Sequence, residues 1–242
     1  MPEQQSSSSS NIIQKLSIPL AIVIAGALIA GAVYFGGGGG AGGGDKPISV
    51  NVKDVSIRPH NPVLGNANAP VTLAYWFDYQ CPFCKAVDVG GIPEIPIEPA
   101  MPTLVKDYVE TGKLKIVFKD YAFLGPDSTT AALYKHAVWD LYPDTFYEWH
   151  EAMFHAQDEE HGGFGNEESI LELIRGISGL DAGRLQQDVA ANRDTYLANI
   201  AADQTEGASF GIQGTPGFIT GTTLIPGADD LATFIAAIDA QL

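Results

Sequence analysis

The stretch Phe77-Asp78-Tyr79-Gln80-Cys81-Pro82-Phe83-Cys84-Lys85 (residues 77–85) contains the only two cysteines of the chain. Two residues between the cysteines let their sulfurs reach disulfide geometry across the first turn of a helix, where unpaired backbone N–H groups and the helix dipole favour a thiolate. We expect Cys81 to be the nucleophile at the exposed helix start, with Pro82 at an early position where its missing N–H costs little. Cys84, partly buried one turn further in, could attack a mixed disulfide formed at Cys81. The stretch therefore predicts a redox site.

The same cysteine spacing also occurs in zinc sites and in structural disulfides. A protein zinc site usually has four ligands, and no second C-x-x-C follows. His150-Glu151 with His155 resembles H-E-x-x-H but has one residue too many, which places the second histidine about 140° around a helix from the first. We therefore expect no metal site, and expect these histidines to be partly exposed or at the edge of the core. A disulfide closing so small a loop would restrict the unfolded chain little, which disfavours a purely structural role.

The composition describes an acidic chain that is long enough for a sizeable core. Of its 242 residues, 45% are hydrophobic and 10% aromatic, and the net charge is −16. One domain with an appendage is the simplest organisation. The negative charge repels phosphates, so we expect no nucleic-acid partner. Because both cysteines belong to one motif, composition alone does not fix the redox compartment.

The N-terminal fifth of the chain has the pattern of a membrane tether. Residues 1–11 are polar and serine-rich, which predicts disorder. Residues 12–35 contain an uncharged apolar run long enough to cross a lipid bilayer, although Ala30-Gly31-Ala32 also resembles the cleavage site of a signal peptide. Residues 36–47 are a Gly-rich linker. Lys15 before the apolar run favours an inside N-terminus, so the domain over residues 48–242 would lie outside the cytoplasm.

The strand signals lie on both sides of a long helical region. We expect an edge strand within residues 48–57, a buried strand over Val71–Phe77 and a second strand over Leu114–Asp120. Residues 214–225 predict a hairpin with Gly221 at its turn. A strand, a short loop and a helix opened by the cysteine pair follow one another as in a thioredoxin-like α/β fold.

Residues 127–205 lack strand signals and predict an inserted domain of about four helices. Their starts are indicated by residues that cap helices, and the final helix of the chain has a similar signal. The expected caps are Asp127 or Ser128, Thr145 in a capping box with Glu148, Asn166, Asp181, and, for the final helix, Asp229 or Asp230. Between the cysteine helix and the strand at Leu114, a further helix is expected from about Pro102 to Thr111.

The two informative motifs together resemble those of the DsbA-like thiol–disulfide oxidoreductases of the thioredoxin superfamily, over about residues 60–242. The resemblance rests on Cys81-Pro82-Phe83-Cys84 and Gly214-Thr215-Pro216, with further echoes at Pro62-Val63-Leu64-Gly65, Ala69-Pro70-Val71-Thr72, and Trp149-His150 before Met153-Phe154. It implies a redox-active Cys81–Cys84 disulfide with no other cofactor. It also implies a cis-proline loop at Pro216, where the Thr215 backbone can pair with an extended substrate. Substrates would be the thiols of exported proteins, and a membrane redox partner would re-oxidise the site.

Two positions depart from the family pattern. Strongly oxidising members often carry histidine where this chain has Phe83, so the pKa of Cys81 should depend on the helix N-terminus, with Lys85 as a further contributor. Thioredoxins place a buried acid where this chain has Tyr75. Proton transfer from Cys84 would then fall to water or to Asp78, unless Asp78 caps the helix or faces solvent.

The resulting expectation is an outward-facing, membrane-tethered enzyme that oxidises protein thiols. A reductase or isomerase with the same site remains open, because sequence does not set a redox potential. A tethered, chaperone-like module that binds peptides without catalysis also remains open.

Overall fold

The computed structural model describes residues 49–158 and 162–242. The predicted disordered N-terminus, membrane anchor and Gly-rich linker, which together span residues 1–47, lie outside the described residues. Within the described part of the chain, no helix is both long enough and apolar enough to cross a membrane.

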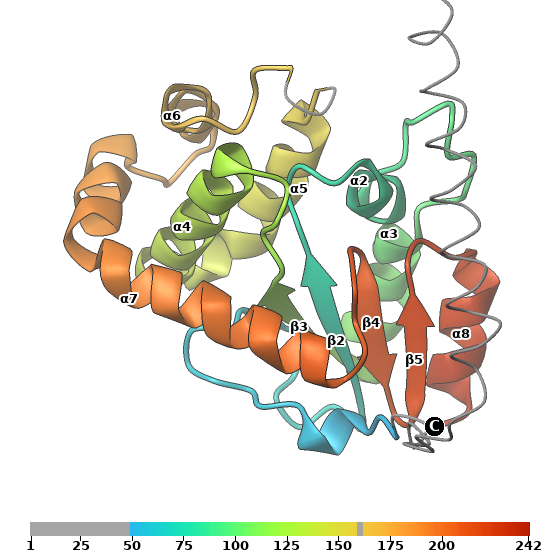
Figure 1. The fold of residues 1–242 in the computed structure, drawn as a ribbon. Coiled ribbons are helices and arrows are strands. Elements are labelled where there is room, and N and C mark those ends of the chain that lie inside the picture. Colours follow the sequence, from blue (N-terminus) through green and yellow to red (C-terminus); the bar gives the residue numbers. More distant parts are fainter. Residues whose placement is uncertain (1–48, 159–161) are drawn as a thin grey trace, which may run out of the picture. The chain divides into compact units, whose positions relative to one another are not determined.

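The described residues form an α/β domain in which helices pack around one sheet (Figure 1). The strands are β1 (Val63–Leu64), β2 (Val71–Phe77), β3 (Leu114–Asp120), β4 (Gly217–Thr220) and β5 (Thr223–Pro226). The α-helices are α2 (Pro82–Asp88), α3 (Ala100–Leu104), α4 (Pro126–Leu141), α5 (Phe146–Ala156), α6 (Glu167–Gly176), α7 (Ala182–Ser209) and α8 (Leu231–Asp239). Shorter turns of helix are η1 (Val52–Asp54), η2 (Val105–Val109) and η3 (Pro143–Thr145).

The sheet has the order β1-β3-β2-β4-β5, in which β2 and β3 are parallel and the other neighbours are antiparallel. The chain passes from β2 to β3 through α2 and α3, and from β3 to β4 through the four helices α4 to α7. The predicted strands at Val71–Phe77 and Leu114–Asp120 are confirmed to the residue. The predicted hairpin is also confirmed, with strands at Gly217–Thr220 and Thr223–Pro226 and with Gly221 in its turn at φ 56°. The thioredoxin-like fold expected from the sequence is thus observed.

Strand β2 separates two parts of the core because successive side chains of a strand point to opposite faces. Tyr75 and Phe77 belong to a large cluster that includes side chains of α2, α3, α5 and α8. Trp76 belongs to a smaller cluster on the other face, which the C-terminal part of α7 crosses (Figure 1). There the Trp76 indole donates to the carbonyl of Asp203 at 2.9 Å, and a Cβ on Gly207 would stand 2.9 Å from the ring.

The predicted edge strand within residues 48–57 is wrong. Val50 and Val55 are buried as an apolar pattern requires, but the residues between them form η1. The side chain of Asn51 caps that turn by accepting from the N–H of Lys53, and the N–H of Val52 donates to the carbonyl of Gly221. The edge position beside β3 is occupied by β1 instead.

Two of the predicted caps are confirmed and two are wrong. Asn166 accepts from the N–H of Ser169 at the start of α6, and Asp181 accepts from the N–H of Arg184 at the start of α7. Helix α4 begins at Pro126, so neither Asp127 nor Ser128 caps it. Thr145 precedes α5 but its side chain accepts no hydrogen bond, because its backbone has helical angles and continues η3 into α5.

Several smaller predictions are confirmed only approximately. The helix expected from Pro102 to Thr111 runs over α3 and η2, which is a π-helical turn. Asp230 precedes α8 without a side-chain cap, while the carboxylate of Asp229 accepts from the hydroxyl of Thr233.

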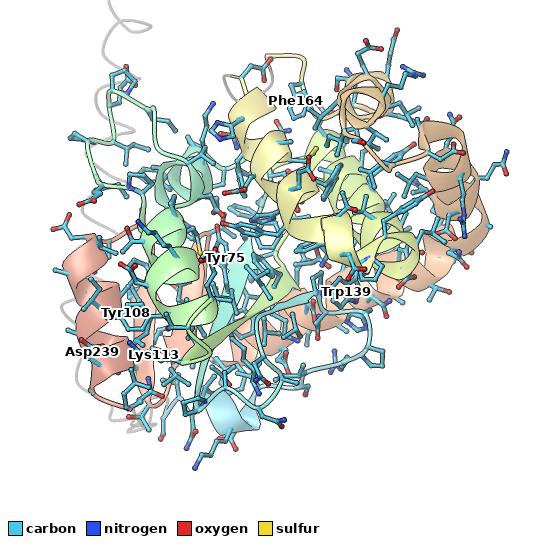
Figure 2. The ribbon with its side chains drawn as sticks, turned by 180° about the vertical axis from the view of Figure 1, so that it is seen from behind. Tyr75, Tyr108, Lys113, Trp139, Phe164 and Asp239 are labelled. Carbon is cyan, nitrogen blue, oxygen red and sulfur yellow. The ribbon has the colours of Figure 1, made fainter. Side chains whose placement is uncertain are left out.

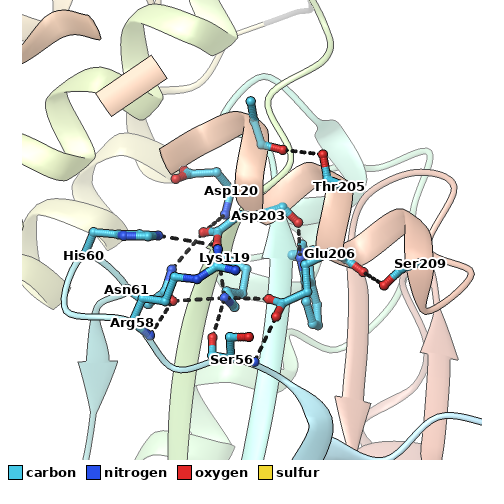
Figure 3. A network of polar contacts seen from close by, with 12 residues as sticks. Ser56, Arg58, His60, Asn61, Lys119, Asp120, Asp203, Thr205, Glu206 and Ser209 are labelled. Carbon is cyan, nitrogen blue, oxygen red and sulfur yellow. Dashed lines mark hydrogen bonds and ion pairs between the residues drawn. The ribbon is translucent and has the colours of Figure 1, made fainter. Parts of the chain in front are cut away.

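Charged side chains are buried on the face of the sheet that carries Trp76 (Figure 3). Lys119 of β3 is fully enclosed, and its ammonium group contacts Asp203 at 3.0 Å and Glu206 at 2.8 Å, both on α7. The same ammonium donates to the side chain of Asn61 at 2.9 Å and to the carbonyl of Ser56 at 2.7 Å. Because each N–H donor of Lys119 is paired, this network holds α7 and residues 56–61 against the sheet.

Candidate active site

Strand β2 ends at Phe77, and the loop that follows leads directly into α2, which the cysteine pair opens. Cys81 precedes the helix with an extended backbone (φ −81°, ψ 118°), and Pro82 is the first helical residue. The carbonyl of Cys81 accepts from the N–H groups of Cys84 and Lys85 at 3.1 and 3.2 Å. The predicted helix start is therefore confirmed.

Both cysteines are free thiols, and both are buried. Cys81 is only 4% exposed, so its predicted exposure is wrong, and Cys84 is fully enclosed rather than partly buried. The cover over Cys81 is the loop before β4, where the Thr215–Pro216 peptide bond is cis, as the resemblance implied. The Cys81 thiol donates to the carbonyl of Thr215 at 3.2 Å. The two motifs, 134 residues apart in the sequence, are thus in direct contact.

The surroundings of Cys81 stabilise its thiolate. Its pKa is lowered to about 7, chiefly by a hydrogen bond from the thiol of Cys84, while burial acts in the opposite direction. The side chain of Thr215 and the backbone N–H groups of Cys84 and Phe83 lower the pKa further. These N–H groups belong to the start of α2, as the sequence predicted.

Lys85 does not take the role expected of it. Its ammonium group donates to the backbone carbonyl of Gln157, just beyond α5. The side chain of Gln157 in turn donates to the carbonyls of Tyr79 and Cys81, at 2.6 and 3.2 Å. These contacts attach the loop before the cysteines to the end of α5.

The pKa of Cys84 is shifted in the opposite direction. Burial raises it well above the ordinary value, and the neighbouring Cys81 and the charge of Asp88 raise it further. A hydrogen bond from the backbone of Asp78 acts against this rise. In the dithiol form, Cys81 therefore ionises first and Cys84 retains its proton. Two groups of the same kind whose surroundings shift their pKa values in opposite directions are typical of an active site.

A chain of buried polar side chains lies next to Cys84. Tyr75 lies in the interior of the domain (Figure 2). Its hydroxyl donates to one oxygen of Asp88 at 2.5 Å, and the other oxygen lies 2.9 Å from Nε2 of His150. The Nδ1 atom of His150 lies 2.9 Å from the hydroxyl of Tyr79. His150 is fully buried, so its predicted place at the core edge is wrong, whereas His155 is exposed. The tyrosine that replaces the family's buried acid thus contacts another buried acid.

Asp78 neither caps α2 nor faces solvent. It is 1% exposed, and its carboxylate accepts from the backbone N–H groups of Gln80 at 2.9 Å, Phe123 at 2.9 Å and Leu124 at 3.1 Å. Burial raises the pKa of Asp78, although these hydrogen bonds act against the rise. The carboxylate therefore joins the loop after β2 to the loop after β3.

Two hollows flank the cysteine pair. One is an open pocket of about 870 Å³ between Pro82, Phe83 and the proline-rich segment 91–96. Phe83 is 49% exposed at its edge. The other has a volume of about 230 Å³ and is lined by residues 211–217 together with Leu224, Pro226 and Gly227. Residues 91–96 thus form one wall of the pocket beside the active-site dipeptide.

Comparisons with known proteins agree with this geometry. A family model described as thioredoxin matches residues 58–240. The chain belongs to the thioredoxin family. It is 26% identical, over 181 residues, to disulfide bond formation protein D of Bacillus subtilis (strain 168), an alignment covering 75% of this chain and 77% of that protein.

Two solved structures are similar to the described fold. The oxidised BdbD of Bacillus subtilis superposes with a TM-score of 0.69 at 25% identity, covering 81% of this chain and 98% of that one. The thiol–disulfide exchange protein α-DsbA2 of Wolbachia pipientis gives a TM-score of 0.62 at 28% identity, covering 74% and 86%. This family member is therefore a DsbA-like protein-disulfide oxidoreductase.

Sequence reasoning missed Asp88, His150 as its partner, and Gln157. Asp88 carried a local signal, because a residue four positions after Cys84 lies on the same side of a helix. The pairing of Asp88 with His150 joins residues 62 positions apart, and Gln157 reaches back 76 positions to Cys81. No local pattern indicates such contacts.

Proposed function

We propose that this thioredoxin-family enzyme forms disulfides in exported proteins, with its catalytic domain outside the cytoplasm. The observation that carries the proposal is the opposite behaviour of the two thiols, with the pKa of Cys81 lowered and that of Cys84 raised. A stabilised thiolate favours the dithiol form over the disulfide, which makes the disulfide form a better oxidant. The relative named for disulfide bond formation supports the same direction.

The oxidising reaction would proceed in two exchanges. A substrate thiolate attacks the sulfur of Cys81 in the Cys81–Cys84 disulfide, that S–S bond breaks, and Cys84 leaves as a thiolate that takes up a proton. A second substrate thiolate then attacks the substrate sulfur of the mixed disulfide, and Cys81 leaves as a thiolate. The substrate loses two electrons and gains a disulfide, while the enzyme becomes a dithiol. A membrane redox partner would accept those electrons and restore the disulfide.

The substrate would bind as an extended segment across the cis-proline loop. The backbone of Thr215, beside Pro216, would pair with it in the manner of an added strand. The exposed ring of Phe83, with Pro82, would contact the residues that flank the substrate cysteine. The pocket beside segment 91–96 extends this contact surface.

The location of the enzyme is proposed from its N-terminal sequence. Residues 12–35 would anchor the chain in the lipid bilayer, and residues 36–47 would serve as a flexible linker to the catalytic domain. Newly exported proteins would then pass the active site with their thiols still reduced.

Cysteine variants test the proposal on a reduced, unfolded substrate protein. Cys81→Ser is expected to abolish oxidation, because it removes the sulfur that is attacked. With oxidised glutathione supplied as the oxidant, Cys84→Ser is expected to accumulate mixed disulfides between Cys81 and the substrate, because the thiol of Cys84 that could release the substrate is missing. Full activity in both variants would refute the proposal.

The direction of the reaction is tested by equilibrating the enzyme with glutathione. We expect the reduction potential of the Cys81–Cys84 pair to be more oxidising than that of a typical reductase. For thioredoxin this potential is about −270 mV. A strongly reducing value would replace the oxidase role with that of a reductase or isomerase. A variant with both cysteines changed to serine tests the non-enzymatic alternative, since client binding with unchanged affinity would indicate a peptide-binding module.

A further inference from the structure

Cys84 must lose a proton before it can attack a mixed disulfide, and its surroundings oppose that loss. The thiol is fully enclosed, so bulk water does not contact it. Removal of its proton into solvent would leave a thiolate in an apolar environment, which is unfavourable. Transfer of the proton to a neighbouring side chain as the sulfur attacks would avoid a free thiolate at Cys84.

Titratable groups surround Cys84 and its neighbour Asp88. Cys81 just before α2, Asp88 on α2, Tyr75 on β2 and the backbone of Asp78 act on Cys84. Tyr79 in the loop before α2, and Tyr147 and His150 on α5, act on Asp88, and Asp120 of β3 acts on Tyr79. Among the described residues, no lysine or arginine forms an ion pair with Asp88, and the imidazole of His150 lies 2.9 Å from its carboxylate.

Tyr75 connects the thiol to Asp88. Its hydroxyl donates to Asp88 at 2.5 Å and also makes a side-chain contact with Cys84. Tyr75 itself keeps its proton at neutral pH, because burial, the charge of Asp88 and its contacts with Asp88 and Cys84 raise its pKa. The Tyr75 hydroxyl can therefore receive a proton from Cys84 and give its own to Asp88 without remaining as a tyrosinate.

His150 holds Asp88 in place from the other side. The Tyr79 hydroxyl can donate to Nδ1, which leaves the proton of a neutral imidazole on Nε2, where it points to Asp88. In this arrangement every group has a partner, and Asp88 is a carboxylate that accepts from both sides.

We propose that Asp88 is the proton acceptor for Cys84 and that the Tyr75 hydroxyl relays the proton. The S–H proton of Cys84 passes to the oxygen of Tyr75 as the Tyr75 proton passes to Asp88. The thiol loses one proton, Asp88 gains one, Tyr75 is unchanged, and no electrons move. The charge of Asp88 disfavours a thiolate at Cys84, and protonation of Asp88 removes that repulsion at the moment of attack. The proposal rests on the assignment of Cys81 and Cys84 as the redox pair.

The relay is tested with the dithiol enzyme and the aromatic disulfide 5,5′-dithiobis(2-nitrobenzoate). Attack by Cys81 releases one thionitrobenzoate at a rate proportional to reagent concentration. Attack by Cys84 on the resulting mixed disulfide releases the second, at a rate independent of that concentration. The two absorbance phases thus report separately on the two cysteines, and each can be followed from pH 5 to pH 10.

Tyr75→Phe and Asp88→Asn are expected to slow the second phase at pH 7 by roughly 100-fold, as for loss of general acid–base catalysis. The first phase should be unchanged. The defect should shrink as pH rises, because a growing fraction of Cys84 is then ionised without the relay. The double variant should be no slower than the slower single variant, since both residues serve one relay.

Tyr75→Phe keeps the buried ring, which stacks on Phe218 at 4.4 Å, so it remains informative even if Asp88→Asn does not fold. The matched control is Tyr196→Phe, which removes a hydroxyl bonded to Asp140 and Asp188 outside the site. Wild-type second-phase rates in Tyr75→Phe across the pH range would overturn the relay. Equal slowing of both phases, or the same slowing in the control, would also overturn it. Absence of the first phase in the wild-type enzyme would instead reject the proposed function.

Discussion

The hydrogen bond from Cys84 to Cys81 is expected to account for most of the thiolate stabilisation, and Cys84→Ala removes it. A hydrogen bond to a charged group contributes about 1.5–3 kcal/mol. One pKa unit corresponds to about 1.36 kcal/mol, so the pKa of Cys81 should rise from about 7 by roughly 1–2 units. At pH 7 the thiolate fraction of Cys81 would then fall from about one half to between about 1% and 10%.

The assay is the rate of alkylation of Cys81 by iodoacetamide as a function of pH, because only the thiolate reacts. The midpoint of the rate profile gives the pKa in each variant. Cys84→Ser is the matched control, since its hydroxyl retains a donor at the same position. We expect Cys84→Ser to have a midpoint between those of the wild type and Cys84→Ala.

An unchanged midpoint in Cys84→Ala would refute this reasoning. The backbone N–H groups at the start of α2 would then be sufficient to hold the pKa of Cys81 near 7. Equal midpoints for Cys84→Ala and Cys84→Ser, both raised, would show that the sulfur itself is required rather than a donor.

Three further variants test other parts of the structure. The pKa of Asp203 is lowered in the folded protein, so its contribution to stability is present above the unfolded value of about 3.9 and is lost as pH falls below it. Urea unfolding of Asp203→Asn should therefore depend less on pH between 5 and 3 than unfolding of the wild type. Gly207→Ala should destabilise the fold by about 1–3 kcal/mol in the same assay, because its Cβ would meet Trp76 at 2.9 Å, whereas Gly183→Ala on the same helix should not. Phe83→His should move the alkylation midpoint of the active-site thiol below 7, because an imidazolium at the helix start favours the thiolate.

Elements whose cause is local could be predicted from the sequence. Strand β2 has a near-continuous apolar run, since both of its faces are covered by other parts of the chain, and in β3 the apolar Leu114, Ile116 and Phe118 alternate with other residues. Asn166 and Asp181 cap helices through hydrogen bonds to residues three positions ahead, so the signal and its effect lie in the same short segment. The helix start at Pro82 follows from the same kind of local rule.

Features that depend on distant contacts could not be predicted. The valines of residues 48–57 are buried as expected, but the N–H of Val52 pairs with Gly221, a contact that no periodicity indicates. Lys85 has a charge suited to a thiolate, yet the end of α5 offers it the carbonyl of Gln157. The burial of Cys81 depends on Thr215, which follows the helical region in the sequence and is 134 residues away from Cys81.

The helices between β3 and β4 contribute to the redox site as well as to the core. Strand β2 leads into α2 and so positions the two cysteines, and Tyr75 lies on the same strand. Helix α5 and the residue that follows it add His150 behind Asp88 and Gln157 beside the carbonyl of Cys81. A shift of α5 would therefore alter both the group proposed to accept the Cys84 proton and the loop that presents Cys81. The chemistry of the pair thus depends on contacts that a minimal thioredoxin sheet, without these helices, would lack.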